Sequence, residues 1–164
     1  VAFRTATTTL RMIPMLIVVI FVLPMIGLAE WAMPLPPTAS SAVMFVLALL
    51  VTVLLSSAIT MIMHVTLYWM IQGRGITTIM GGIVPVFSGM IVPLPLFPDW
   101  AQGFLYWQPF RGLADTPFRI YSGNIPADQA GLEIALQLGW FVVIVLIGYL
   151  LLERARRSLV VQGG

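Results

Sequence analysis

The sequence contains no cysteine and no lysine. Without cysteine the chain forms no disulfide, offers no thiolate nucleophile and lacks a common class of metal ligand. Without lysine it cannot complete a P-loop, and no GxxxxGK[ST] motif is present, so the chain is not itself a P-loop ATPase. GxSxG and HExxH motifs are also absent, and the apolar segments offer almost no convergent polar groups for a membrane-embedded enzyme.

Charge of either sign is scarce as well. Charged residues make up 9% of the 164 residues, whereas about 25% is usual for a soluble domain. Hydrophobic residues make up 60%, and the mean hydropathy is +1.02. So few charges cannot cover a water-facing surface, which predicts an integral membrane protein. All eight basic residues are arginines scattered among apolar segments, a pattern that favours membrane orientation over nucleic-acid binding.

Four segments have the length and composition of transmembrane helices, which predicts an all-α membrane fold. They are residues 12–28, 42–71, 76–92 and 134–152, each with at least 17 residues free of Asp, Glu and Arg. That length is near the minimum for a hydrocarbon core of about 30 Å. We treat residues 1–164 as a single transmembrane domain. The chain begins with valine and shows no signal peptide, so we expect that an N-terminal portion is missing.

The arginines predict the orientation of this domain. With four crossings, six arginines share one face of the membrane and two share the other, and the larger group is expected in the cytoplasm. Both ends of the chain would then be cytoplasmic. The cytoplasmic group is Arg4, Arg11, Arg74, Arg154, Arg156 and Arg157; Arg111 and Arg119 share the opposite face with Glu30, Asp99, Asp115, Asp128 and Glu133.

The predicted spans hold almost no ionisable side chain. His64 is the only titratable group well inside one of them. It could relay protons or bind substrate, or it could simply form a hydrogen bond to a neighbouring helix. Ion-coupled transporters commonly place acids or paired charges inside the membrane. Because none lies inside the predicted spans, we expect the driving force for any transport to come from another subunit.

The stretch before the last predicted span combines charges with aromatic residues. A full crossing would place Arg111 and Asp115 near mid-bilayer, at roughly 2.5–3.5 kcal/mol each, and would remove the arginine bias. A loop in water is also disfavoured, because Trp100, Phe104 and Trp107 recur at i, i+4 and i+7 and share one helical face.

We predict that residues 99–122 form a hairpin of two short helical pieces, broken near Pro109 and Pro117. This hairpin would lie in the interface at the outer face of the membrane, or dip partly into it. Thr116 suits the start of the second piece and Gly123 suits its end. The alternative is an aromatic belt that only anchors the protein.

Rows of small residues mark two predicted spans. One consists of Gly81, Pro85 and Gly89, and the other begins at Gly131 and continues through Ala135 and Gly139. Such rows let helices approach closely, and the same glycines can instead permit kinks. Both interpretations remain open at this point.

Several stretches resemble a known family. These are "SGMIVPLPLFPDW", "LYWQPFRGLADTPFRIYSGNIP" and "GWFVVIVLIGYLLLERARRSLVVQGG". Together they resemble the C-terminal part of a permease of the type-two ABC exporter superfamily, and most of all bacterial antibiotic and multidrug exporters. The resemblance extends over most of the chain, but its specific part is residues 88–124 and 153–164. Such permeases usually have six spans and cytoplasmic termini. The chain resembles their last four spans, so an N-terminal portion with two more spans would be missing. The resemblance implies a location in a bacterial plasma membrane.

The resemblance implies partners and a mechanism. Two permease subunits, identical or not, would pair with two cytoplasmic P-loop ATPase subunits, which bind ATP and Mg, so no cofactor is expected in this chain. The permease would form the path for an amphiphilic substrate, such as a drug, an antibiotic or a lipid. The hairpin before the last span would resemble the re-entrant helices that help to close the outer gate, with Trp100, Phe104, Trp107, Phe110 and Arg111 as candidate gate residues.

Contact with the ATPase is expected at the short turn that contains Gln72 and Arg74, although Arg74 could be only a positive-inside anchor. The alternative function is a non-transport membrane subunit that anchors or assembles a larger complex. A membrane-embedded enzyme is the third possibility, but it would need a polar site that the sequence does not offer.

Overall fold

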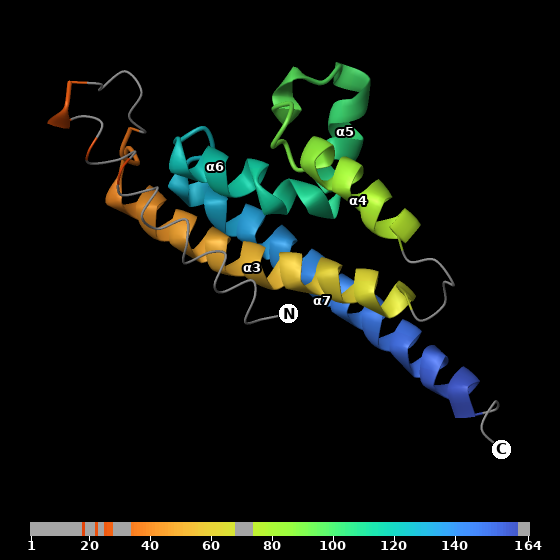
Figure 1. Ribbon diagram of the computed structural model, residues 1–164. Coiled ribbons are helices and arrows are strands. Elements are labelled where there is room, and N and C mark those ends of the chain that lie inside the picture. Colours follow the sequence, from red (N-terminus) through yellow and green to blue (C-terminus); the bar gives the residue numbers. More distant parts are fainter. Residues whose placement is uncertain (1–17, 19–21, 23–24, 28–33, 68–73, 161–164) are drawn as a thin grey trace.

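Two long helices that run side by side in the same direction form the centre of the fold (Figure 1). The computed structural model describes residues 18, 22, 25–27, 34–67 and 74–160, and in these ranges every regular element is helical. The long helices are α3 (Ala39–Leu67) and α7 (Ala127–Val160). For the described residues, the prediction of an all-α fold is therefore confirmed.

The packing of side chains between α3 and α7 follows this parallel arrangement. Near the end where both helices begin, called the starting end below, Ala48 of α3 packs with Ala130 of α7. Further along, Leu55 of α3 packs with Ile144 of α7. The increase in residue number along both helices from one cluster to the next shows that they are parallel rather than antiparallel.

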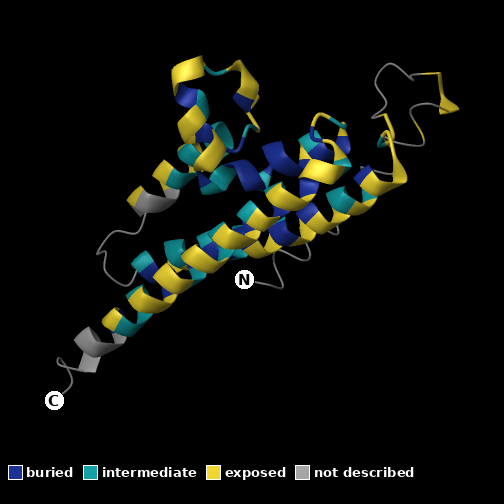
Figure 2. Cartoon of the chain, turned by 180° about the vertical axis from the view of Figure 1, so that it is seen from behind, coloured by how far each residue is buried: buried dark blue, intermediate teal, exposed yellow. Residues whose placement is uncertain are grey.

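Many residues of α3 and α7 are exposed (Figure 2), and large apolar side chains are numerous among them. Both helices are long and apolar enough to cross a membrane, over Ala39–Thr66 and Ala127–Ala155. In the most apolar 18-residue stretch of each helix, only 22% of α3 and 17% of α7 is buried in the structure. The central helix of a soluble domain would be mostly buried, so this exposed apolar surface is suited to lipid.

Helix α4 (Arg74–Phe87) runs back toward the starting end. Two parallel helices that both cross a bilayer require the chain to return across it between them. Helix α4 has 14 residues, about 21 Å at 1.5 Å per residue, which is shorter than a hydrocarbon core of about 30 Å. The described residues thus contain two candidate spans and one shorter apolar helix, rather than four full spans.

The predicted spans agree with the helices only in part. The segment 12–28 lies almost wholly outside the described residues. The segment 42–71 corresponds to α3, which begins three residues earlier, and residues 68–73 are outside the described part of the chain. The segment 76–92 was drawn too long, because α4 ends at Phe87.

The end of α4 is a glycine turn. Gly89 has a positive φ of 84°, a backbone conformation that glycine adopts without steric cost. The amides of Met90 and Ile91 both donate to the carbonyl of Pro85, at 3.1 and 3.3 Å, and so close the last turn. The glycine therefore ends this helix rather than extending a row of small residues along it.

Between α4 and α7 the chain forms four short helical pieces. They are η3 (Leu94–Leu96), α5 (Asp99–Trp107), η4 (Pro109–Leu113) and α6 (Asp115–Tyr121). Residues 99–122, called the broken-helix segment below, thus contain three pieces instead of the predicted two. Figure 1 shows α5 projecting away from the pair of long helices, whereas η4 and α6 lie along it.

One predicted break is correct and the other is misplaced. The chain leaves the helical conformation at Gln108, directly before Pro109. The second break is at Ala114, and Pro117 lies inside the first turn of α6. Proline is tolerated there because an amide in the first turn has no carbonyl partner within the helix. Gly123 follows α6 with a φ of 77°, as a helix stop requires.

Helix α7 begins at Ala127, seven residues before the predicted start of the last span. Asp128 and Glu133 were placed before the span, on the outer face of the membrane. They form helix nevertheless, since Ala130 and Ile134 pack against α3 and Glu133 pairs with Arg111. This extension brings two acidic residues, Asp128 and Glu133, into the helix.

The row of small residues on α7 does not bring α3 and α7 together. No atom of the described chain lies within 4 Å of a Cβ built at Gly131 or Gly139. The close approach occurs at Gly148 instead, where a Cβ would lie 2.5 Å from Cε of Met61.

Candidate functional site

The part of the broken-helix segment from Trp107 to Tyr121 lies along the pair of long helices. It begins well inside the pair and runs back to the starting end. At the inner position, Nε1 of Trp140 donates to the carbonyl of Trp107 at 2.7 Å. Trp140 is 13 residues into α7, about 20 Å from its first residue. At the other end of the segment, the ring of Tyr121 meets Phe45 of α3 edge to face, with 4.9 Å between ring centroids. The segment therefore spans a considerable part of the length of α7.

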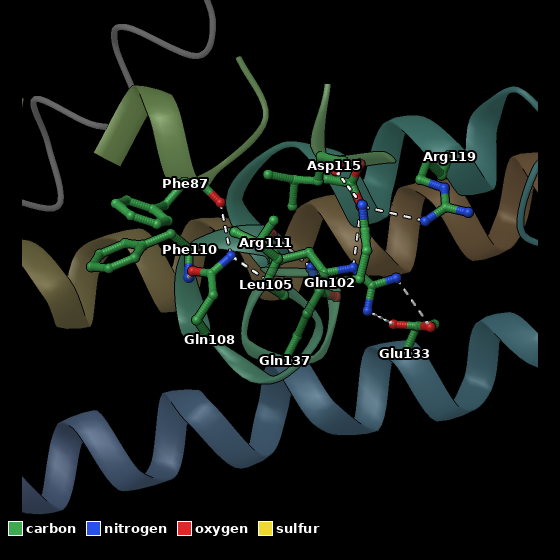
Figure 3. A network of polar contacts seen from close by, with 12 residues as sticks. Phe87, Gln102, Leu105, Gln108, Phe110, Arg111, Asp115, Arg119, Glu133 and Gln137 are labelled. Carbon is green, nitrogen blue, oxygen red and sulfur yellow. Dashed lines mark hydrogen bonds and ion pairs between the residues drawn. The ribbon is translucent and has the colours of Figure 1, made fainter. Parts of the chain in front are cut away.

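The centre of the segment is the side chain of Arg111, which is buried with only 5% of its surface exposed. Its Nε donates to Oδ2 of Asp115 at 3.1 Å. Its NH1 and NH2 donate to the two carboxylate oxygens of Glu133, at 2.9 and 3.3 Å. Figure 3 shows the guanidinium held between the two acids, one on α6 and one on α7.

Two further groups complete the surroundings of Arg111. The guanidinium lies over the ring of Tyr106, 4.5 Å from its centroid, as in a cation–π contact. Arg119 forms a looser ion pair with Asp115, with 3.7 Å between NH1 and Oδ2. The cluster thus holds two arginines and two acids, and its formal charges cancel. A buried charge without such partners would be strongly unfavourable.

The backbone near Arg111 is held by amide side chains. Gln108 ends α5, and its Oε1 accepts a hydrogen bond from the amide of Phe110 at 2.7 Å, so that it caps η4. Its Nε2 donates to the carbonyl of Phe87 at 2.8 Å and joins the segment to the end of α4. The backbone N–H of Asp115 donates to the carbonyl of Ser88 at 3.0 Å, which makes a second link to the end of α4.

The carbonyl of Gly112 accepts hydrogen bonds from both long helices. Oγ1 of Thr52 on α3 donates to it at 2.8 Å, and Nε2 of Gln137 on α7 donates to it at 2.7 Å. A Cβ on Gly112 would lie 2.9 Å from Cγ of Gln137 and 3.0 Å from Cδ2 of Leu55. Glycine is therefore required here by the close approach of the backbone to α3 and α7.

Three side chains on α7 hold the segment, and they lie on one face of the helix. Glu133, Gln137 and Trp140 are spaced at i, i+4 and i+7, which places them in a row. They bind, in order, the guanidinium of Arg111 and the carbonyls of Gly112 and Trp107. This polar row fixes the broken-helix segment to α7 at successive depths.

The structure separates the predicted gate residues into two groups. Trp100, Phe104 and Trp107 are exposed on α5, at 86%, 64% and 60% of their surface, so the aromatic face predicted from their spacing is present. Phe110 is half-buried on η4. Arg111 is buried in the ion-pair cluster and presents no charge to the surface.

Of the two residues predicted to contact the ATPase, Gln72 lies outside the described residues and Arg74 is the first residue of α4. His64 is exposed on α3, and its Nδ1 lies 2.7 Å from the carbonyl of Thr60 on the same helix. Since a carbonyl only accepts, the nitrogen donates. This bond satisfies the histidine within α3, whereas a bond to a neighbouring helix was predicted.

The expectation that the subunit assembles no buried acid–base pair is wrong, because Glu133 of α7, a candidate span, pairs with buried Arg111 of η4. Sequence analysis missed Glu133, Gln137 and Gln108 as site residues. The polar row on α7 was a usable signal, since its i, i+4, i+7 spacing stands out in an apolar helix. No group of three or more His, Asp and Glu that could hold a metal ion occurs among the described residues.

Replacement of Arg111 by methionine should destabilise the protein strongly. The change leaves Glu133, whose side chain is 12% exposed, without its cationic partner and leaves Asp115 paired only with the looser Arg119 among the described residues, which typically costs about 3–5 kcal/mol. The control is Arg154→Met, the same chemical change at an exposed position, with an expected effect below about 1 kcal/mol. Thermal unfolding of the purified chain in detergent measures both. Equal effects of the two variants would contradict the role given to the buried cluster.

Gly112→Ala should also destabilise the protein, by roughly 1–3 kcal/mol, because the added methyl group overlaps side chains that cannot move freely. The matched control is Gly103→Ala on α5, where nothing lies within 4 Å of the added carbon. There alanine should be neutral or stabilising by up to about 1 kcal/mol, because it favours helix. The same unfolding assay compares the two, and a harmless Gly112→Ala would exclude the close approach.

Comparison with known proteins identifies the family. The family model described as ABC-2 family transporter protein matches residues 6–163, nearly the whole chain. No curated protein and no solved structure matches the chain. Membrane components of this family typically lack an ATPase domain, in agreement with the missing P-loop, and as components of ABC transporters they imply an ATPase partner. The chain belongs to the ABC-2 family of transporter proteins and is a membrane component of that family.

Proposed function

We propose that this chain is the membrane-spanning permease subunit of an ATP-driven exporter, and that the broken-helix segment is part of its outer gate. ATP is hydrolysed by separate cytoplasmic P-loop subunits, and a second permease subunit completes the path. The substrate is amphiphilic: a drug, an antibiotic or a lipid-like molecule. The observation that carries the proposal is the attachment of the broken-helix segment to α4, α3 and α7 by buried polar contacts.

The order of the helices supports the proposed orientation. Because α3 and α7 are parallel, α4 is the helix available for the return crossing, and the broken-helix segment then extends from the starting end to the level of Trp140. Arg74 and Arg154 lie toward the opposite end, where α4 begins and α7 approaches its end. The positive-inside rule assigns that end to the cytoplasm and the broken-helix segment to the outside.

The contacts explain how movement of the spans could reach the gate. Glu133, Gln137 and Trp140 hold the segment at three depths of α7, so a tilt of α7 carries the segment with it. Gln108 links the same segment to α4. When ATP binding brings the ATPase subunits together, a shift between α4 and α7 therefore changes the shape of the segment.

The exposed face of α5 supports an amphiphilic substrate path or a contact with the second permease. Trp100, Phe104 and Trp107 are exposed on a helix that projects away from the long pair. Apolar and aromatic linings are typical of sites for apolar and amphiphilic ligands. Gln72 and Arg74, at the opposite end of α4, are the proposed contact with the ATPase.

The proposed orientation predicts the labelling of single cysteines, which the cysteine-free chain makes simple. Trp100→Cys replaces a residue that is 86% exposed and should react with a membrane-impermeant maleimide in intact cells. Arg154→Cys, also at an exposed position, should react only after permeabilisation. Labelling of both cysteines from the same side would contradict the orientation.

The proposed gate predicts that labelling depends on nucleotide. In the complex reconstituted with its ATPase, the rate at Trp107→Cys should change severalfold on addition of ATP, because the carbonyl of Trp107 is held by α7. The change should disappear when the ATPase carries an inactive P-loop. The control is Leu132→Cys, 64% exposed near the start of α7, where the rate should stay constant. A stable complex without a nucleotide effect at Trp107→Cys would favour an anchoring or assembly subunit.

A further inference from the structure

A groove of about 700 Å³ lies at the starting end of the fold. Three parts of the chain form it: residues 34–37 before α3, residues 89–93 after α4, and one side of α6. The polar contacts that attach the broken-helix segment to α7 lie elsewhere, so the groove is a separate feature of the same segment. Its two walls differ in chemistry.

The wall on α6 carries the charged side chains of the groove beside the rings of Phe118 and Tyr121. Asp115, Phe118, Arg119 and Ser122 all line the groove, and their spacing of i, i+3, i+4 and i+7 places them on one face of the helical turn. Asp115 and Arg119 are the only charged residues in the lining. All the charge of the groove is therefore concentrated on this wall.

The facing wall is apolar and open. Leu35 and Met90 are 70% and 71% exposed, and several prolines lie beside them. Phe118, 53% exposed, extends this apolar surface from α6. Such side chains gain free energy when an apolar body covers them. Together the two walls match a molecule with one polar end and one apolar body.

The exposed charge in the groove is positive, although the surrounding cluster is neutral. The side chain of Asp115 is 6% exposed, and its carboxylate already accepts from Arg111 at 3.1 Å. The side chain of Arg119 is 36% exposed and contacts that carboxylate only at 3.7 Å. A ligand in the groove thus meets a guanidinium that is weakly paired and a carboxylate that is already neutralised, which selects for an anion.

The position of the groove indicates where the ligand comes from. Gly123, next to α6, lies against Pro37 just before α3, where a Cβ on the glycine would be 2.7 Å from Cγ of the proline. The groove is therefore level with the first residues of α3, which is a candidate span. In a bilayer this level corresponds to the boundary between headgroups and acyl chains.

We propose that the groove binds one anionic phospholipid of the bilayer. Its phosphate lies against the guanidinium of Arg119, and one acyl chain covers Leu35, Met90 and Phe118. The inference requires only that α3 is embedded in a membrane. It does not depend on the direction of transport or on the identity of the transported substrate, so a lipid-binding measurement without nucleotide tests it separately from the proposed function.

Native mass spectrometry of the full chain in detergent, titrated with phosphatidylglycerol or phosphatidylcholine, provides the test. Arg119→Gln should weaken binding of phosphatidylglycerol about tenfold, as expected for the loss of a hydrogen bond to a charged group, and should change phosphatidylcholine little. Arg119→Lys should restore most of the preference for the anionic lipid. Arg154→Gln is the matched control on α7, and it should leave both lipids unaffected.

Two results would overturn the proposal. One is equal binding of phosphatidylglycerol by the wild-type chain and Arg119→Gln, and the other is an equal loss in Arg119→Gln and Arg154→Gln. A second measurement uses the wild-type chain and does not depend on the folding of any variant. Phosphatidylglycerol with a photoactivatable acyl chain should crosslink to residues 34–37 or 89–93, and crosslinks found only elsewhere would refute the groove as the site.

Discussion

The burial of Arg111 between two acids on different helices is the constraint on which the position of the broken-helix segment depends. A guanidinium with 5% exposure is tolerated only if its charge and its N–H groups are matched, and here the match comes from Asp115 on α6 and Glu133 on α7. The two acids together accept from Nε, NH1 and NH2, and neither acid alone binds all three nitrogens. Helix α6, η4 and the first turns of α7 must therefore come together at once, and this fixes where the segment lies.

From this constraint follows the division of the segment into a fixed part and a projecting part. The part from Trp107 to Tyr121 is held along α3 and α7 by the indole of Trp140, the amide of Gln137 and the ion pairs of Glu133. Helix α5 is attached to α7 at its last residue, Trp107, and the part of α5 before it projects away from the long pair and carries the exposed Trp100 and Phe104. A rigid base with a projecting apolar element suits a gate, because the base follows the spans while the projecting part meets the substrate or the partner.

Sequence patterns predicted the fold class, the aromatic face of α5 and the stop at Gly123, because these depend on local periodicity and on backbone conformation. They did not predict that Glu133 belongs to the last helix. An acid next to an apolar stretch looks like a boundary when its partner is unknown, and that partner lies 22 residues earlier in the chain. The end of α4 was missed for a different reason: Gly89 was counted in a row of small residues, although glycine followed closely by prolines is also a helix stop.

The ion pair also changes the reason for assigning the driving force to another protein. A chain without charges in its spans could not couple to an ion gradient, but α7 does contain Glu133, so that argument fails. The assignment to an ATPase depends instead on membership of the ABC-2 family and on a sequence without a P-loop. The geometry of the cluster agrees with a structural role. Arg111 uses Nε, NH1 and NH2 for the two acids, and the same arginine tethers the broken-helix segment to α7.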